Sequence, residues 1–197
     1  MKLSELASVR TGLVLSRKQS NHVDNVAVQY EQLNLKCIID SGDIDIELLD
    51  IFIAAERLKW DYLTHKGDVV VRLSSPYTAV LITEECEGLV VPSHFVTIRA
   101  DGKHLSPEYL FWLLNTEKIK KNIMQNNSGS MLGTIKPSFF AELDIKLIPI
   151  EKQHLVANIN LLAKKESKLL EMLKEQKGIY YRELTKTIQK QMGKGNK

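Results

Sequence analysis

The sequence predicts an α+β protein in which a mixed, twisted sheet with flanking helices is followed by a long C-terminal coiled-coil helix. Residues 1–150 contain short apolar segments separated by turn signals. This irregular order differs from the regular alternation of a doubly wound fold. Residues 151–197 follow Pro149 and repeat apolar side chains at helical spacing, and no glycine occurs from position 134 to 177. We therefore expect a globular domain over 1–150 and a separate helix over 151–197.

The composition is that of an ordinary globular domain with an appendage. The 197 residues are 44% hydrophobic and 26% charged, so the domain can bury a core. No apolar segment approaches the ~20 residues of a membrane span. The first ten residues, MKLSELASVR, carry charges where a signal peptide has an apolar core. We expect a soluble, cytoplasmic protein that does not act at a membrane.

Charge is distributed unevenly along the chain. Residues 151–197 hold 11 Lys and Arg against 5 Asp and Glu, whereas residues 1–150 hold 16 against 19. A basic helix of this kind can contact phosphates. It can equally present an ordinary solvated face, and the composition leaves both interpretations open.

The first third of the chain predicts few regular elements. Residues 2–10 favour a short helix or an irregular lead-in, residues 26–30 alternate as in a half-buried strand, and residues 48–58 favour a short helix. Residues 16–25, SRKQSNHVDN, are polar without apolar periodicity and indicate an exposed loop. That loop is either an ordinary solvated segment or a nucleic-acid contact through Arg17, Lys18 and Asn21.

A β-hairpin is predicted in the middle of the chain. Gly67-Asp68 opens a strand over 69–73, Ser74-Ser75-Pro76 forms a turn, and residues 78–82 return. The tip gathers Arg72, Ser74, Ser75 and Tyr77. Arginine can form hydrogen bonds to guanine or to a phosphate, and serine hydroxyls can contact either kind of group. The alternative is a hairpin whose arginine stem faces the core.

The elements predicted after residue 88 follow from helix-capping residues and from the alternation of apolar and polar side chains. Residues 89–98 favour a strand in which Pro92 implies an edge or a bulge. Ser106-Pro107-Glu108 is a strong helix start, and that helix should end before residue 126. A flexible loop over 128–133 precedes a short helix capped by Ser138 and a final strand over 143–147. The loop offers Ser128, Ser130 and Lys136 as further polar contacts, or it is an unremarkable surface loop.

The C-terminal helix carries an apolar seam that its own domain cannot cover. The seam residues are Leu155, Ile159, Leu162, Leu169, Leu173 and Tyr180. A heptad seam of this kind packs on a second helix, so we expect function to need at least two chains. Gly178 lies within the helical pattern and marks a possible break or kink.

No catalytic, metal or cofactor motif is present in the sequence. The segment 129–133 lacks the ending of a P-loop and the GxGxxG spacing, and GxSxG and HExxH are absent. Cys37 and Cys86 stand outside any CxxC or CxxH unit, so two reduced core thiols are expected. The acidic segment 43–50 is interpreted as a surface turn, although a dyad assembled from distant residues stays open. We predict no cofactor and no catalytic residue.

The order of several short motifs resembles that of type I restriction-modification specificity (S) subunits. GDVVVR at 67–72 resembles their "GDilisr" strand, and LSPEYL at 105–110 resembles their "lsp.yl" helix start. Residues 129–136 with 143–149 are similar to their "G.....i....l..i.iplP" segment, and Gln153 matches the "eQ..I" that opens their long helix. QKG at 176–178 with ELT at 183–185 resembles the family's ending. The departures are a single proline at 149 and Ser74-Ser75-Pro76 in place of a glycine tip.

The resemblance implies a non-catalytic subunit that reads DNA. Members of the family have two target-recognition domains and two conserved helices, and this sequence matches one of each. Residues 1–150 would then be one target-recognition domain reading one half-site of double-stranded DNA. The helix would pair antiparallel with a second copy and dock methyltransferase subunits, with a restriction subunit as a possible further partner. Residues 151–177 span about 40 Å at ~1.5 Å each.

Two other functions remain open at this point. A coiled-coil interaction module would assemble through the helix without reading DNA. A small hydrolase or nuclease would need carboxylates brought together from distant parts of the chain. The missing motifs argue against the enzyme, and binding-site selection separates the other two.

Overall fold

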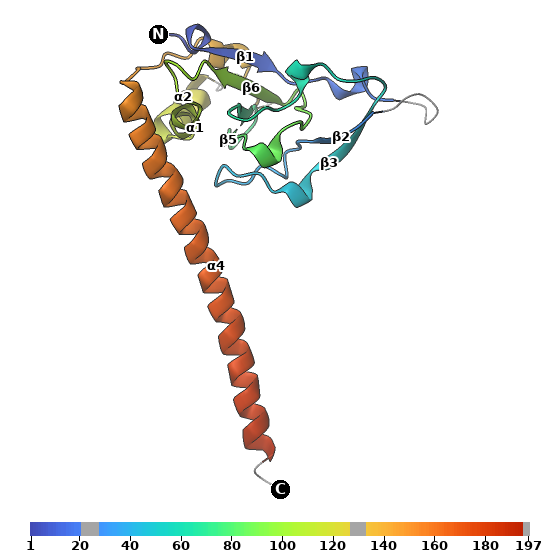
Figure 1. The fold of residues 1–197 in the computed structure, drawn as a ribbon, viewed down its shortest axis with the longest axis vertical. Coiled ribbons are helices and arrows are strands. Elements are labelled where there is room, and N and C mark those ends of the chain that lie inside the picture. Colours follow the sequence, from blue (N-terminus) through green and yellow to red (C-terminus); the bar gives the residue numbers. More distant parts are fainter. Residues whose placement is uncertain (21–27, 127–132, 195–197) are drawn as a thin grey trace. The chain divides into compact units, whose positions relative to one another are not determined.

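The structure, a computed structural model, describes residues 1–20, 28–126 and 133–194. The chain divides into two compact units, Met1–Ala157 and Asn158–Lys197. The first unit contains all the strands and short helices of the described residues (Figure 1). The described part of the second unit, residues 158–194, is entirely helical.

A four-stranded antiparallel sheet forms the centre of the first unit. Its order is β1 (Ala7–Thr11), β6 (Phe95–Ala100), β4 (Val69–Arg72) and β5 (Ala79–Leu81). β4 is buried at Val69, Val70 and Val71, as expected for β-branched residues in an inner strand. The predicted hairpin is confirmed, because β4 and β5 pair from Val69↔Leu81 to Val71↔Ala79.

A two-stranded antiparallel sheet joins β2 (Val28–Gln32) to β3 (Asp50–Ala54). The predicted short helix over 48–58 is therefore wrong. Phe52 and Ala54 are buried while Ile51 and Ile53 are exposed. That period of two belongs to a strand, and the pairing with β2 outweighs the local helical tendency.

Three short α-helices follow the last strand: α1 (Pro107–Leu114), α2 (Glu117–Asn126) and α3 (Pro137–Ala141). The predicted start of α1 is confirmed, since the Ser106 hydroxyl accepts a hydrogen bond from the Tyr109 amide. One helix was expected through to residue 125, yet α1 ends at Leu114, with Asn115 as its C-cap. The Asn115 side chain bonds both the amide and the carbonyl of Ala79 on β5, at 3.2 and 3.0 Å, which fixes the chain direction there.

Several other boundaries differ from the sequence prediction. Residues 2–10 form a 3-10 turn and then β1 rather than a helix, and β6 begins only at Phe95. Residue 136, not Ser138, occupies the cap position of α3. The predicted final strand is reduced to a bridge between Lys2 and Asp144. The 3-10 turns are Leu3–Glu5, Leu15–Arg17, Ile46–Leu48, Trp60–Tyr62 and Glu84–Cys86.

The α+β class with a long C-terminal helix is confirmed, although strand direction is not as expected. Every pairing between the named strands is antiparallel, whereas a mixed sheet was predicted. Cys37 and Cys86 are buried free thiols, and burial raises the pKa of both. Among the described residues, no helix has the length and apolarity needed to cross a membrane.

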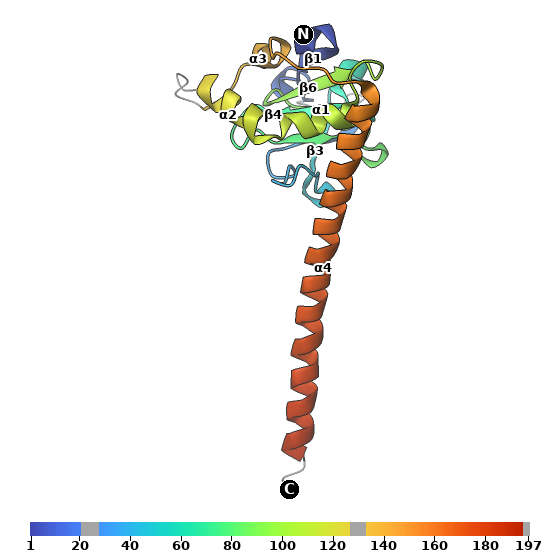
Figure 2. The same ribbon diagram turned by 90° about the vertical axis from the view of Figure 1, so that its left-hand side faces the viewer.

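The last helix, α4, runs without interruption from Ile150 to Lys194 over 45 residues (Figures 1 and 2). Its first two turns belong to the first unit. Gly178 lies inside the helix, and a Cβ added there would meet nothing within 4 Å. The break or kink considered at Gly178 is absent, because α4 continues through this position and runs straight in both views (Figures 1 and 2).

Candidate nucleic-acid interface

The tip of the β4–β5 hairpin lies against the segment that precedes α3. The Ile135 amide donates to the Leu73 carbonyl at 2.8 Å, and Ser74 forms a bridge with Thr134. The Leu73 amide donates in turn to the His94 carbonyl at 3.0 Å. Residues 73–74, 94 and 134–135, which are far apart in sequence, thus meet at the end of β4. We call this region the hairpin edge. Two of its parts, the hairpin tip and the segment around Lys136, were predicted separately as polar contacts.

Tyr77 holds this arrangement together. Its φ of 57° lies in the left-handed region, which is uncommon for a residue with a side chain. The ring is only 4% exposed, and its hydroxyl donates to the Gly133 carbonyl at 2.9 Å. The burial of the ring and this hydrogen bond indicate that Tyr77 holds the loop in place.

Arg72 is the strongest candidate for a direct contact. Its Nη1 donates to the Leu35 carbonyl at 3.3 Å and its Nη2 to the Ser75 carbonyl at 3.2 Å. No carboxylate pairs with it among residues 1–20, 28–126 and 133–194, so its charge is not neutralised there. Both hydrogen bonds are long, and both acceptors are neutral, which leaves the guanidinium available for a stronger anionic partner.

His94 is a candidate that the sequence reasoning missed. Burial, followed by the positive charge of Arg72, holds the pKa of His94 below its ordinary 6.5, so the ring is neutral at pH 7. Three polar atoms near the hairpin are buried without a hydrogen-bond partner in the described part of the chain: Arg72 Nε, Thr78 Oγ1 and His94 Nε2. Buried polar groups in this state call for water or a ligand group. The sequence did not reveal His94 because its position next to Arg72 depends on the pairing of β4 with β6, in which Phe95 lies opposite Arg72.

The other predicted polar residues lie elsewhere or outside the described residues. Arg17 is exposed in the turn Leu15–Arg17, beside β3, because Ser20 donates to Ile53 and Ala55 to Lys18. Lys18 is ion-paired with Glu56, which weakens its attraction for phosphate. Lys136 is exposed immediately before α3, on the segment that borders the hairpin. Asn21, Ser128 and Ser130 lie outside the described residues.

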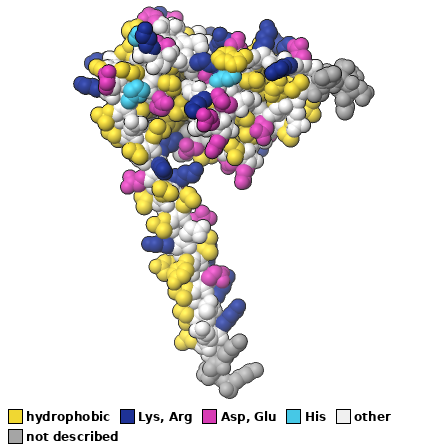
Figure 3. All heavy atoms as spheres, in the orientation of Figure 1, with side chains coloured by type: hydrophobic (Ala, Val, Ile, Leu, Met, Phe, Trp, Pro, Cys, Tyr) yellow, Lys and Arg dark blue, Asp and Glu magenta, His cyan; other side chains and the backbone are white. Residues whose placement is uncertain are grey.

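The six predicted dimerisation residues form an exposed apolar face on α4. Leu155, Ile159, Leu162, Leu169, Leu173 and Tyr180 are between 51% and 66% exposed. Further exposed apolar side chains flank them at helical spacing: Leu170, Tyr181, Leu184, Ile188 and Met192. Figure 3 shows hydrophobic side chains recurring along the helix. Taken together, these residues make a face wider than a single heptad seam.

The first turns of α4 are fixed to α1 by Gln153, whose side chain is fully buried. Its oxygen accepts from the Ser106 amide at 3.0 Å, and its nitrogen donates to the carbonyls of His104 and Ile148 at 2.8 and 2.9 Å. All of its side-chain polar groups are therefore satisfied. The same glutamine opens the long helix in the family motif that the sequence resembles.

The α+β body and the long helix together share their fold with solved type I restriction-modification specificity subunits. No protein-family profile and no curated protein matches the chain. Among solved structures, a chain from a study of complex assembly and conformational transition of the type I R-M system aligns with TM-score 0.64 and 18% identity. It covers 87% of this chain and 43% of that one.

Two further structures agree. The HsdS subunit from Thermoanaerobacter tengcongensis aligns with TM-score 0.63 and 17% identity, over 86% of this chain and 43% of that one. The type I restriction-modification system S subunit from M. genitalium aligns with TM-score 0.50 and 11% identity, over 84% and 38%. The resemblance seen in the sequence is confirmed at the level of fold. The chain spans less than half the length of each of these structures.

Proposed function

We propose that this chain is the DNA-recognition subunit of a type I restriction-modification system, reading one half-site and acting as a homodimer that docks methyltransferase subunits. The observation that carries the proposal is the shared fold over 87% of the chain, with body and long helix both included. Methyl transfer would then belong to the methyltransferase subunits, and cleavage to a restriction subunit in a system that includes one. The chain itself would be non-catalytic.

The hairpin edge supports the reading role. Arg72, Ser74, Ser75 and Lys136 are the side chains that we propose to touch double-stranded DNA. Arginine forms bidentate bonds to guanine O6 and N7, and lysine neutralises phosphates. Tyr77 would hold the hairpin edge in position. His94 would adjust the electrostatic environment of Arg72, which lies beside it. Arg17, Lys18, Asn21, Ser128 and Ser130 remain proposed contacts on flanking segments.

The exposed face of α4 supports pairing with a second copy. The seam residues recur from Leu155 to Tyr180, and a symmetric antiparallel pair would place Leu155 of one copy opposite Tyr180 of the other. The twofold axis would then pass close to Leu169. The interval of 25 residues spans about 38 Å at ~1.5 Å each. Two bodies held that far apart suit a bipartite, palindromic target whose halves lie more than one turn of ~34 Å apart.

The width of the apolar face supports docking of a further partner. A two-helix coiled coil covers a narrow seam, while flanking apolar residues call for more helices around it. Tyr181, Ile188 and Met192 flank the seam and stay exposed on the single chain. We propose that helices of the methyltransferase subunits cover these flanks.

Binding-site selection tests the proposal most directly. The full chain, mixed with the adenine methyltransferase subunit of its own system, would be offered random duplex DNA, and the retained pool sequenced. We expect a motif of two short inverted half-sites separated by a fixed spacer. Retention without any shared motif would instead favour the coiled-coil module that does not read DNA. Absence of both DNA and partner binding would refute the proposal as a whole.

A further inference from the structure

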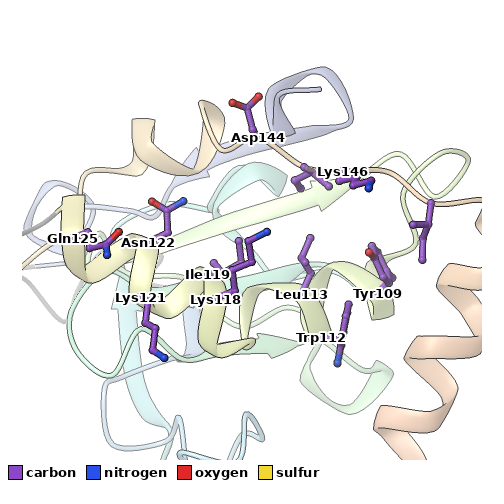
Figure 4. Close-up of a pocket in the computed structure, with 12 residues that line it drawn as sticks. Tyr109, Trp112, Leu113, Lys118, Ile119, Lys121, Asn122, Gln125, Asp144 and Lys146 are labelled. Atoms are coloured by element: carbon purple, nitrogen blue, oxygen red, sulfur yellow. The ribbon is translucent and has the colours of Figure 1, made fainter.

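A second surface on the first unit lies apart from the hairpin edge. It is a groove of about 570 Å³ between α1, α2 and the segment 144–148 (Figure 4). Volumes of ~300–1,000 Å³ are typical of sites that accept a ligand or an anchoring side chain. The groove therefore has room for apolar side chains of a partner.

The groove has an apolar floor. Leu113, Ile119, Ile145 and Ile148 line it together with the rings of Tyr109 and Trp112. These rings lie 5.3 Å apart at an interplanar angle of 35° and support one another. Tyr109, Ile119 and Ile145 are themselves buried, so the floor is part of the packed body rather than a loose surface. An apolar recess of this kind gains free energy when another apolar group removes it from water.

The rim of the groove is basic. Lys118 and Lys121 come from α2, Lys146 from the segment before α4, and Asp144 is the only carboxylate among the lining residues. None of the three lysines has an ion pair within the described ranges, whereas Lys2, Lys18 and Lys66 are each paired with a glutamate. Residues 1–150 as a whole carry more acidic than basic side chains, so this rim stands out locally and favours an acidic ligand.

The shape of the site favours a protein segment over DNA. Duplex DNA is read by elements that protrude into its grooves, and its phosphates bind exposed cations. A recess floored by aliphatic side chains matches neither mode. It matches a segment in which apolar anchors fill the floor and carboxylates meet the lysines, an arrangement that gives protein interfaces their affinity and their specificity.

We propose that this groove docks an acidic segment with apolar anchor residues, carried by the methyltransferase subunit. The inference rests on the proposed function, since that function supplies the partner. It adds a contact on the recognition body that is separate from the apolar face of α4. A body held by its partner in this way would be oriented on the DNA by two attachments instead of one.

Charge reversal on the rim provides the test. Lys118→Glu/Lys121→Glu in the full chain would be compared with Lys36→Glu/Lys103→Glu, which makes the same charge change at exposed positions outside the groove. Affinity for the methyltransferase subunit should fall by about tenfold or more in the rim variant, and by about twofold or less in the control. The loss should shrink as salt rises, because it is electrostatic.

A spectroscopic measurement makes the test independent of the variants. The chain has two tryptophans, Trp60 and Trp112. Labelling with 5-fluorotryptophan gives two ¹⁹F resonances, which Trp60→Phe assigns. The Trp112 resonance should shift when the unlabelled methyltransferase subunit binds, because Trp112 lines the groove.

The outcomes separate this inference from the proposed function. If the wild-type chain binds the methyltransferase subunit while the rim variant binds it equally well and Trp112 does not shift, the groove proposal is wrong and the proposed function stands. If the rim variant loses affinity for DNA instead, the groove faces nucleic acid and the proposal is again wrong. If the wild-type chain does not bind the subunit, both fail.

Discussion

Gln153, in the first turn of α4, accepts a hydrogen bond from the Ser106 amide at the start of α1, at 3.0 Å. The two residues are 47 positions apart, and Gln153 is fully buried. The bond connects the N-terminus of α1 to α4, the helix that we propose for dimerisation. The first two turns of α4 therefore belong to the first unit.

Replacing Gln153 with leucine should destabilise the body. The change removes three hydrogen bonds and leaves the buried Ser106 amide without this partner. We expect the free energy of unfolding to fall by about 2–4 kcal/mol, measured by urea denaturation. Gln189→Leu, at an exposed position on α4, should change it by less than about 0.5 kcal/mol. Equal stability of the Gln153 variant and the wild type would contradict this account.

Arg72→Ala should relax sequence preference at one base pair of the half-site. If the guanidinium reads a base edge, discrimination there should fall by about 1–3 kcal/mol while other positions keep theirs. Competition binding with single-base variants of the selected site measures this. Arg57→Ala, at an exposed arginine without a proposed role, serves as the control. A uniform loss over all sequences would assign Arg72 to a phosphate instead.

Cysteine cross-linking should reveal the direction and centre of the α4 pair. With an antiparallel pair centred near Leu169, Leu169→Cys should cross-link to itself under mild oxidation. Leu155→Cys should cross-link to Tyr180→Cys but not to itself. Glu175→Cys, on the opposite face of the helix, is the control. Self-cross-linking of Leu155→Cys would indicate a parallel pair, and a monomer in light scattering would exclude the pair altogether.

His94 should make stability depend on pH. Its pKa in the folded protein lies below 6.5, first because of burial and second because of Arg72. As pH falls through this range, the unfolded state takes up a proton that the folded state does not. The free energy of unfolding should therefore decrease from about pH 7 to pH 5, by at most ~1.4 kcal/mol per pH unit for one group. Urea titrations at both pH values should show a smaller decrease for His94→Asn, and an unchanged decrease would count against this role.

Gly178→Ala should stabilise α4. The glycine is helical, and an added Cβ meets nothing within 4 Å, so only the conformational freedom of the unfolded chain changes. A gain of about 0.5–1 kcal/mol is expected, seen as a higher melting temperature by far-UV circular dichroism. Glu175→Gly should shift the melting temperature downward. A loss of stability in Gly178→Ala would mean that the glycine is needed for a close approach by a second helix.

The sequence predicted best those elements whose signals are local. The start of α1 follows from Ser106 and Pro107, which act within one turn, and the β4–β5 hairpin follows from three valines and a turn of serine and proline. The apolar face of α4 follows from spacing alone, because a helix has one period along its whole length. The strand β3 was misjudged, since its identity depends on pairing with β2, in which Tyr30 lies opposite Phe52 from 22 residues earlier in the chain.

The sequence by itself determined the α+β class, the hairpin, the long helix and the residues of its exposed apolar face, since each depends on neighbours within a few positions. Only the tertiary structure decided that the hairpin edge meets the segment around Lys136, that Tyr77 is buried there, and that His94 lies beside Arg72. It also decided that Lys118, Lys121 and Lys146 surround one groove. These relationships join residues far apart in the chain, and packing rather than local preference sets which distant residues meet.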